Sequence, residues 1–264
     1  MAAVPFQQWN AVEGQASAEF FDQEDGFLLR FPGVADFMVD ATGVSVSCVP
    51  VPGVGELWKS VYEQQVVPLL VSLHGGHVFH GGAVAIDGRA VAFLARSGQG
   101  KSTLTAAFAR RGMPFLSDDC LHLELGGAQA YARPHAPYVR LWEDSAGVMG
   151  DGDPAYAAGS PKPRIMAGER FPHQAEATPL ARMYLLGTGE AAAPVIESLP
   201  ASQALIGLTA NAFVLDIKNP AVLKRNLQAH ARLVQEVPVR RLDYPRRYDV
   251  LDEVVALVLA DAAG

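Results

Sequence analysis

The segment that most constrains the fold is residues 95–102, Ala-Arg-Ser-Gly-Gln-Gly-Lys-Ser. It follows the apolar run 90–94 and precedes residues 103–109, whose composition predicts a helix. A strand, a glycine-bearing loop, a Lys-Ser pair and a helix in this order predict a phosphate-binding P-loop. Loop amides and free amides at the helix start then point at one spot, where the helix dipole favours an anion. The alternative is a glycine-rich turn before an ordinary helix, which does not explain the Lys-Ser pair.

Within this loop each residue type has a predicted task. Lys101 is expected to reach the terminal phosphates, and the Ser102 hydroxyl is expected to bind magnesium. Ala95 stands where such loops usually begin with glycine, and a Cβ is tolerated there at negative φ. The predicted nucleotide-binding residues are Ala95, Arg96, Ser97, Gly98, Gln99, Gly100, Lys101, Ser102 and Thr103.

Composition excludes several classes of protein. The 264 residues, half of them hydrophobic, suit one sizeable domain or a domain with a small extra lobe. The net charge of −7 argues against a nucleic-acid partner, and we interpret the pairs Arg110-Arg111, Arg240-Arg241 and Arg246-Arg247 as solvated. No basic segment followed by an apolar one opens the sequence, and no apolar run reaches membrane-spanning length. Cys48 and Cys120 are predicted to be free thiols, so we expect a cytoplasmic protein without a membrane partner.

The chain is predicted to have two parts. Residues 17–51 alternate apolar and polar positions between glycines, which predicts an antiparallel meander. A helix over 55–73 with a kink at Pro68 follows and ends at Gly75-Gly76. These elements make residues 1–74 a small β-rich lobe, and residues 75–264 a P-loop domain.

In the second part, the strand 81–86 turns at Asp87-Gly88 into the strand that feeds the P-loop. Residues 126–175 are rich in Gly, Pro and Ala and predict long functional loops. Further predictions are a strand over 180–186 and helices over 202–214, 220–236 and 249–261. The expected fold class is mixed α/β, a mixed sheet flanked by helices.

Carboxylates and a histidine stand where a nucleotide enzyme needs them. Asp118-Asp119 follows the run Phe115-Leu116-Ser117, one short helix after the P-loop, so one carboxylate is predicted to hold magnesium and the other to accept a proton from an attacking hydroxyl. A surface turn is the alternative for this pair. His80 opens the strand before the hairpin and can lie near the phosphates, or it is an ordinary core histidine. A zinc site with His74 and His77 is disfavoured because Gly75-Gly76 separates them.

Three cations are candidates for contact with the transferred phosphate. Lys162 and Arg164 lie in the Gly/Pro-rich segment and could stabilise charge that develops on the γ-phosphate. Arg140 could act in the same way. The alternatives are a solvated loop for the first two residues, and packing of the Arg140 stem on Trp142 for the third.

Taken together, residues 80–84, the turn 87–88, residues 97–102 and residues 116–119 resemble the catalytic core of the HPr kinase/phosphorylase family, in the same order and spacing. Residues 31–35, 138–142, 162–164, 179–186 and 237–242 are more similar to shorter HPr-kinase-like proteins, which include kinases encoded beside lasso-peptide pathways. The strongest resemblance covers about residues 75–125.

The resemblance implies a fold like the nucleotide domain of phosphoenolpyruvate carboxykinase and an ATP- and magnesium-dependent serine kinase. Lys101 would bind phosphates, Ser102 would hold magnesium, and Asp118 would be the general base with His80 close to it. Asp119 would organise metal or phosphate. The acceptor would be a peptide or small protein, a lasso precursor being one example. Too few residues precede His80 for the regulatory enzyme's N-terminal domain, and the signature segment tied to dephosphorylation has no convincing copy.

Two other functions stay open at this point. A small-molecule kinase would use the same chemistry on a metabolite alcohol. A nucleotide-gated regulatory protein would bind ATP without transfer, for which Ala95 and the missing signature segment leave room. Related family members often assemble, so a homo-oligomer is a further expectation from the resemblance.

Overall fold

The computed structural model describes residues 4–10, 16–127, 129–149 and 162–263, which form two compact units. The first unit contains the chain up to Gly75 and also Val214–Leu223, a segment from much later in the sequence. The second unit contains most of the remainder, including the P-loop. Among the described helices, none is long and apolar enough to cross a membrane.

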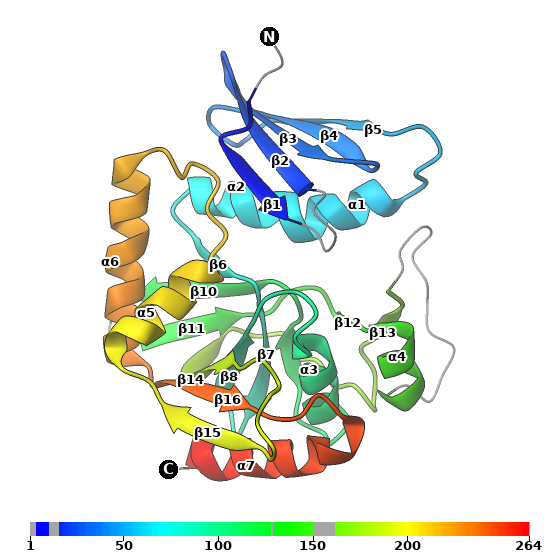
Figure 1. Ribbon diagram of the computed structural model, residues 1–264, viewed down its shortest axis with the longest axis vertical. Helices are drawn as coiled ribbons and strands as arrows, with labels where there is room; N and C mark the ends of the chain where they lie inside the picture. The colour runs from blue at the N-terminus through cyan, green and yellow to red at the C-terminus, as the bar shows by residue number, and fades with distance from the viewer. Residues whose placement is uncertain (1–3, 11–15, 128, 150–161, 264) are drawn as a thin grey trace. The chain divides into compact units, whose positions relative to one another are not determined.

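The first unit is built on an antiparallel sheet whose strands follow one another in chain order (Figure 1). The meander predicted for residues 17–51 is confirmed, because its first three strands bury alternate side chains and positive-φ glycines at 26, 33 and 43 lie at the turns. The strands are β1 Gln7–Asn10, β2 Ala16–Gln23, β3 Gly26–Phe31, β4 Ala35–Asp40 and β5 Val46–Pro50.

One interrupted helix packs on this sheet, and Tyr62 stacks on Phe37 of β4 with ring centroids 6.0 Å apart. It consists of α1 Leu57–Val61, a π-helical turn Tyr62–Val66 and α2 Val67–Leu73. The irregularity predicted at Pro68 takes the form of this wider turn just before the proline. Proline offers no N–H and crowds the carbonyl four residues earlier, and a π turn accommodates both.

The second unit is built on a curled mixed sheet that has nine strands within the described residues, which confirms the mixed α/β class. Strands β8, β14 and β16 are parallel neighbours, whereas the other pairings are antiparallel. The strands are β6 His77–Phe79, β7 Gly81–Ile86, β8 Arg89–Leu94, β9 Phe115–Ser117, β10 Leu121–Gly126, β11 Gln129–Arg133, β14 Thr178–Leu186, β15 Val195–Ser198 and β16 Val239–Asp243.

The hairpin before the P-loop forms as its sequence predicts. Asp87 and Gly88 both take positive φ, 49° and 74°, and join β7 to β8 in antiparallel register. Both central residues of a type I′ turn need positive φ, which glycine and aspartate supply at low cost. The hairpin therefore fixes the strand that leads into the P-loop.

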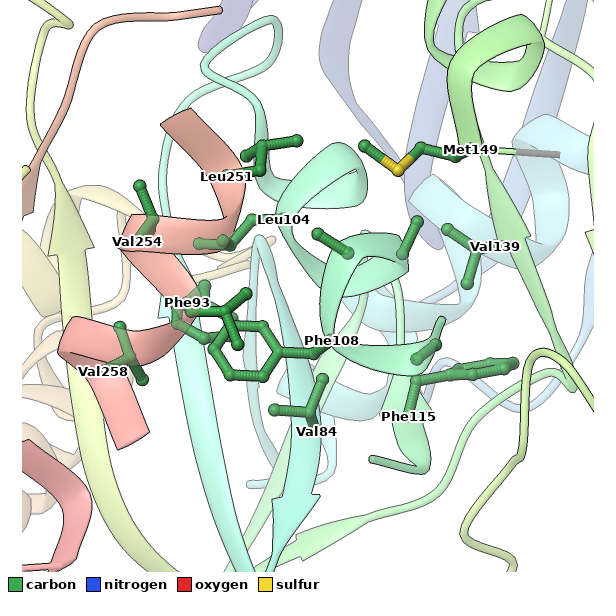
Figure 2. Close-up of a cluster of buried hydrophobic side chains, with 14 of the residues drawn as sticks. Val84, Phe93, Leu104, Phe108, Phe115, Val139, Met149, Leu251, Val254 and Val258 are labelled. Carbon is green, nitrogen blue, oxygen red and sulfur yellow. The ribbon is translucent and has the colours of Figure 1, made fainter. Parts of the chain in front are cut away.

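Strands β7 and β8 are buried on both faces. Side chains of one face pack with α3 Lys101–Ala109 and α7 Leu251–Ala263, and Figure 2 shows Phe93 of β8 against Phe108, with Val254 and Val258 beside them. The alternate side chains, mostly alanine, belong to a second buried cluster with residues of β10 and β11 and of the helices α5 Ala201–Ala210 and α6 Pro220–Glu236. The P-loop helix is therefore held between the sheet and the last helix.

Several element predictions are corrected. Residues 126–175 are not all loop, because β11, β12 Tyr138–Arg140, α4 Glu143–Met149 and β13 Arg164–Met166 lie within them. The helix predicted over 202–214 ends at Ala210, and a short 3-10 turn, Tyr248–Val250, precedes α7. The strand over 180–186 and the helix over 220–236 are confirmed. Cys48 is half-buried and Cys120 is buried, and both are free thiols.

Candidate functional site

The P-loop spans the gap between the end of β8 and the start of α3. Gly98 and Gly100 have φ of 82° and 85°, in the left-handed region where a side chain adds strain. A Cβ on Gly100 would also lie 3.3 Å from the Tyr244 hydroxyl. Ala95 does not take positive φ and its methyl group packs in the core, so alanine suits this position.

The side chain of Lys101 folds back and contacts the backbone of the loop. Lys101 Nζ donates to the Arg96 carbonyl at 3.1 Å, and the Arg96 amide donates to Gln99 Oε1 at 2.9 Å. Burial lowers the pKa of Lys101, while the carboxylates of Asp119 and Asp118 act in the opposite direction. With only 3% of its surface exposed, Lys101 is a desolvated cation at the floor of the site.

A cavity of about 200 Å³ opens over the loop. Three predicted residues outside the loop line it, namely Asp119, Arg140 and Lys162. The loop itself contributes Ser97, Gly98, Gly100, Lys101, Ser102 and Thr103. The predicted site residues that do not line it are Ala95, Arg96, Gln99, His80, Asp118 and Arg164.

Asp118 is half-buried and does not line the cavity. Its Oδ2 accepts a hydrogen bond from the Arg140 amide at 2.8 Å, and its Oδ1 is shielded from solvent. Burial of the carboxyl group, and then the adjacent charge of Asp119, raise the pKa of Asp118 to about 7, although hydrogen bonds from the Arg140 amide and the Ser102 hydroxyl act in the opposite direction. This carboxylate therefore has the basicity that proton transfer near neutral pH requires.

Asp119 faces the cavity from a strained backbone. Its φ of 65° is rare for a residue other than glycine and turns the chain between β9 and β10. Burial alone would raise its pKa, but the positive charges of Lys162, Lys101 and Arg140 outweigh burial and lower it. Asp119 is therefore ionised at neutral pH, whereas Asp118 can take up a proton.

His80 lies next to the aspartate pair and contacts the backbone of Asp119. Its Nδ1 lies 3.2 Å from the Asp119 carbonyl, and its amide donates to the Asn211 carbonyl at 2.7 Å. Burial, and then the charge of Lys101, lower the pKa of His80 to about 4. The imidazole is therefore neutral at pH 7, and it contacts the backbone of Asp119.

The three candidate cations separate into two groups. Arg140 and Lys162 line the cavity, and Lys162 Nζ lies 4.9 Å from the centre of the Trp142 ring. Arg164 pairs with Arg140 across the β12–β13 ribbon, but its guanidinium lies over Tyr138 at 4.5 Å and does not line the cavity. Two of the three therefore face the place where a terminal phosphate would lie.

Sequence reasoning missed one whole wall of the cavity. Tyr244, Arg246, Arg247 and Tyr248 line it from the segment after β16. A chain of hydroxyl groups joins Thr103 to Ser145 at 3.1 Å and Ser145 to Tyr248 at 3.0 Å. The interpretation of Arg246-Arg247 as solvated is wrong for Arg246, whose side chain is only 25% exposed. The missing signal was the parallel pairing of β8, β14 and β16, which brings their carboxyl ends together.

Comparisons with known proteins add little to this geometry. No protein-family model matches the sequence, and no curated protein matches it. Among solved structures, the HPr(Ser) kinase/phosphatase from Coxiella burnetii aligns with 71% of this chain and 99% of its own, with a TM-score of 0.38 and 12% sequence identity. The function is therefore inferred from the site itself.

Proposed function

We propose that this chain is an ATP- and magnesium-dependent kinase that transfers the γ-phosphate to a serine hydroxyl of a peptide or small protein. The observation that carries the proposal is the convergence at one cavity of the P-loop, Asp119 and two cations, Arg140 and Lys162, with the Asp118 carboxylate hydrogen-bonded to the Arg140 amide beside it. The resemblance of the sequence motifs to HPr-kinase-like proteins supports the same activity. A lasso-type precursor peptide is the acceptor that this resemblance suggests.

The aspartate pair favours transfer over binding alone. Two adjacent carboxylates buried beside a phosphate site are costly, since each loses hydration and each repels the other. Binding of a nucleotide needs the loop amides and Lys101 but no carboxylate with a raised pKa such as Asp118. A base for an incoming hydroxyl explains that carboxylate.

The residues present fit a magnesium ion. Magnesium in such sites is held by one or two protein oxygens together with substrate phosphates, so a dedicated cage of side chains is not needed. Among the described residues no cluster of three or more His, Cys, Asp or Glu could hold a metal, whereas Ser102 and Asp119 both line the cavity. Ser102 and Asp119 would hold the ion, which would offset the negative charge of the phosphates.

In the proposed reaction the loop amides and Lys101 hold the phosphate chain. The serine oxygen forms a bond to the γ-phosphorus while the bond from that phosphorus to the β–γ bridging oxygen breaks, and ADP leaves. The serine proton passes to Asp118, and Lys162 and Arg140 stabilise charge on the transferred group.

The test is a mass-spectrometric transfer assay with ATP and magnesium, using a serine-ended lasso precursor and the HPr protein as parallel acceptors. We expect one added phosphate on the precursor. Asp118→Asn should keep nucleotide binding and lose transfer by at least about 100-fold, because the base is gone. Lys101→Ala should lose both binding and transfer, because the phosphate contact is gone.

Asp22→Asn is the matched control, since this aspartate lies on the surface of the first unit in an ion pair with Lys218. It should transfer phosphate like the wild type. Full activity of Asp118→Asn would rule out Asp118 as the general base. Bound ATP with no transfer to either acceptor would instead favour a small-molecule kinase or a regulatory protein.

A further inference from the structure

The cavity extends past the phosphate loop to a wall that the proposed reaction does not use. The carboxyl ends of the parallel strands β8, β14 and β16 lie at the same edge of the sheet. From them come the P-loop, the turn Gly187–Gly189 and the segment Tyr244–Arg246. Ligands of such sheets bind outside the carboxyl ends of the strands, so this wall belongs to the same site.

Arg246 is held within this wall by protein groups on several sides. Its Nη1 donates to the Tyr244 carbonyl at 2.7 Å, and its Nη2 donates to the Gly187 carbonyl at 2.6 Å. Its Nε is buried without a hydrogen-bond partner among the described residues, 3.8 Å from where a Cβ on Gly100 would stand. Its position requires glycine at 189, where a Cβ would lie 2.8 Å from the Arg246 side chain. The guanidinium is therefore fixed in place.

This geometry leaves Arg246 with few donors for a phosphate. An arginine binds phosphate along its edge, through two parallel N–H groups. Here each terminal nitrogen already donates one of its two N–H groups to a carbonyl, and Nε is closed off from solvent and cannot complete a bidentate contact. One face of the guanidinium lies on the Tyr244 ring, with its carbon 4.0 Å from the ring centroid. The opposite face of the guanidinium is left to face the cavity, which Arg246 lines.

We propose that this free face of Arg246 is the stacking platform for the nucleobase of the bound nucleotide, an inference that rests on the proposed function. A planar, weakly hydrated cation that is already ordered stacks on an aromatic base with little further loss of entropy. The Tyr244 ring beneath it extends the stack. Since every base has an aromatic face, the platform favours a nucleotide over a bare phosphate chain without choosing among bases.

The experiment compares two ligands by calorimetry at the same magnesium concentration: ATP, and tripolyphosphate, which has the phosphate chain but no base. In Arg246→Ala we expect the affinity for ATP to fall about tenfold, the factor equivalent to about 1.4 kcal/mol. The affinity for tripolyphosphate should change by less than about twofold, because the P-loop contacts persist. Arg246→Lys should behave like the alanine variant, since it keeps the charge but not the plane.

Arg133→Ala is the control, because Arg133 is exposed, pairs with Glu124 and does not line the cavity. It should leave both affinities unchanged. An equal loss of affinity for ATP and tripolyphosphate in the Arg246 variants would overturn the stacking platform. It would indicate that Arg246 contacts phosphate or supports the P-loop. Unchanged ATP affinity would overturn the platform too. Wild-type protein that binds neither ligand would contradict the proposed function itself, a result distinct from both.

Discussion

Asp118 and Asp119 are neighbours in the sequence, yet their surroundings shift their pKa values in opposite directions. Burial and the charge of Asp119 raise the pKa of Asp118, whereas Lys162, Lys101 and Arg140 more than offset burial at Asp119. Pairs of carboxylates split in this way commonly divide acid–base work between them. The sequence predicted the pair, but its division of roles depends on side chains that are distant along the chain.

The same dependence on surroundings yields a prediction at His230. This histidine is only 1% exposed, and its Nδ1 lies 3.2 Å from the Thr209 hydroxyl oxygen. Burial, and then the charge of His77, lower its pKa from 6.5 to about 4. Below pH 6.5, His230 binds a proton in the unfolded chain before it does so in the folded protein. The free energy of unfolding should therefore fall by about 2 kcal/mol between about pH 8 and about pH 5 because of this residue.

Urea unfolding at those two pH values measures the effect. His230→Asn should reduce the drop in unfolding free energy by about that 2 kcal/mol, because it keeps a polar group near Thr209 but does not titrate. His74→Asn, which changes an exposed histidine, should keep the wild-type drop. The same drop in His230→Asn as in the wild type would show that this histidine is not buried in its neutral form.

At the scale of elements, one carboxylate attaches the last helix to the sheet. Asp261 of α7 accepts hydrogen bonds from Arg182 at 2.5 Å and Tyr184 at 2.6 Å, both on β14, and from Arg240 on β16. The side chains of Arg182 and Asp261 are 10% and 12% exposed. Removing one member of such a group leaves buried charge uncompensated.

Asp261→Asn should therefore lower the free energy of unfolding by about 3 kcal/mol, measured by denaturant titration. Asp252→Asn is the matched control on the same helix, because Asp252 is 83% exposed and pairs with Arg111 at the surface. It should change the unfolding free energy by less than about 1 kcal/mol. Equal effects of the two variants would contradict a special role for the buried carboxylate.

Elements differed in how well the sequence predicted them. The Asp87-Gly88 hairpin and the P-loop helix depend on local rules for turns and for glycine, and both form as predicted. Of the strands in the second unit's sheet, β6, β9, β10, β11, β15 and β16 were not identified. β10 and β11 form a local hairpin, but β6 and β16 pair with strands distant in the sequence, so for them pairing rather than local pattern makes the strand.

At the scale of the whole molecule, the chain leaves the first unit at Gly75 and returns to it with Val214–Leu223. In this segment the Leu215 amide donates to the Ser72 hydroxyl at 3.2 Å, and the Leu215 side chain is fully buried. The first unit therefore has part of its core supplied from the second half of the sequence. Residues 1–75 alone lack that part.

Leu215→Ala should destabilise the first unit by about 3 kcal/mol, because it leaves a cavity in a small core. Hydrogen exchange resolves where the loss falls. Amides of β2–β4 should exchange faster, while those of β7 and β8 should exchange as in the wild type. Leu223→Ala is the control, since that leucine is 45% exposed. Unchanged protection in β2–β4 would show that the first unit does not need Leu215.

The sequence by itself determined the P-loop, the hairpin that feeds it and the meander of the first unit, because each follows from the conformational needs of glycine, aspartate turns and alternating side chains over a few residues. Only the tertiary structure shows which cations face the cavity, which surroundings split the pKa values of Asp118 and Asp119, and that Arg246 lines the wall after β16. These positions follow from the pairing of β8, β14 and β16 and from burial between helices. Contacts between residues many tens of positions apart leave no local pattern to read.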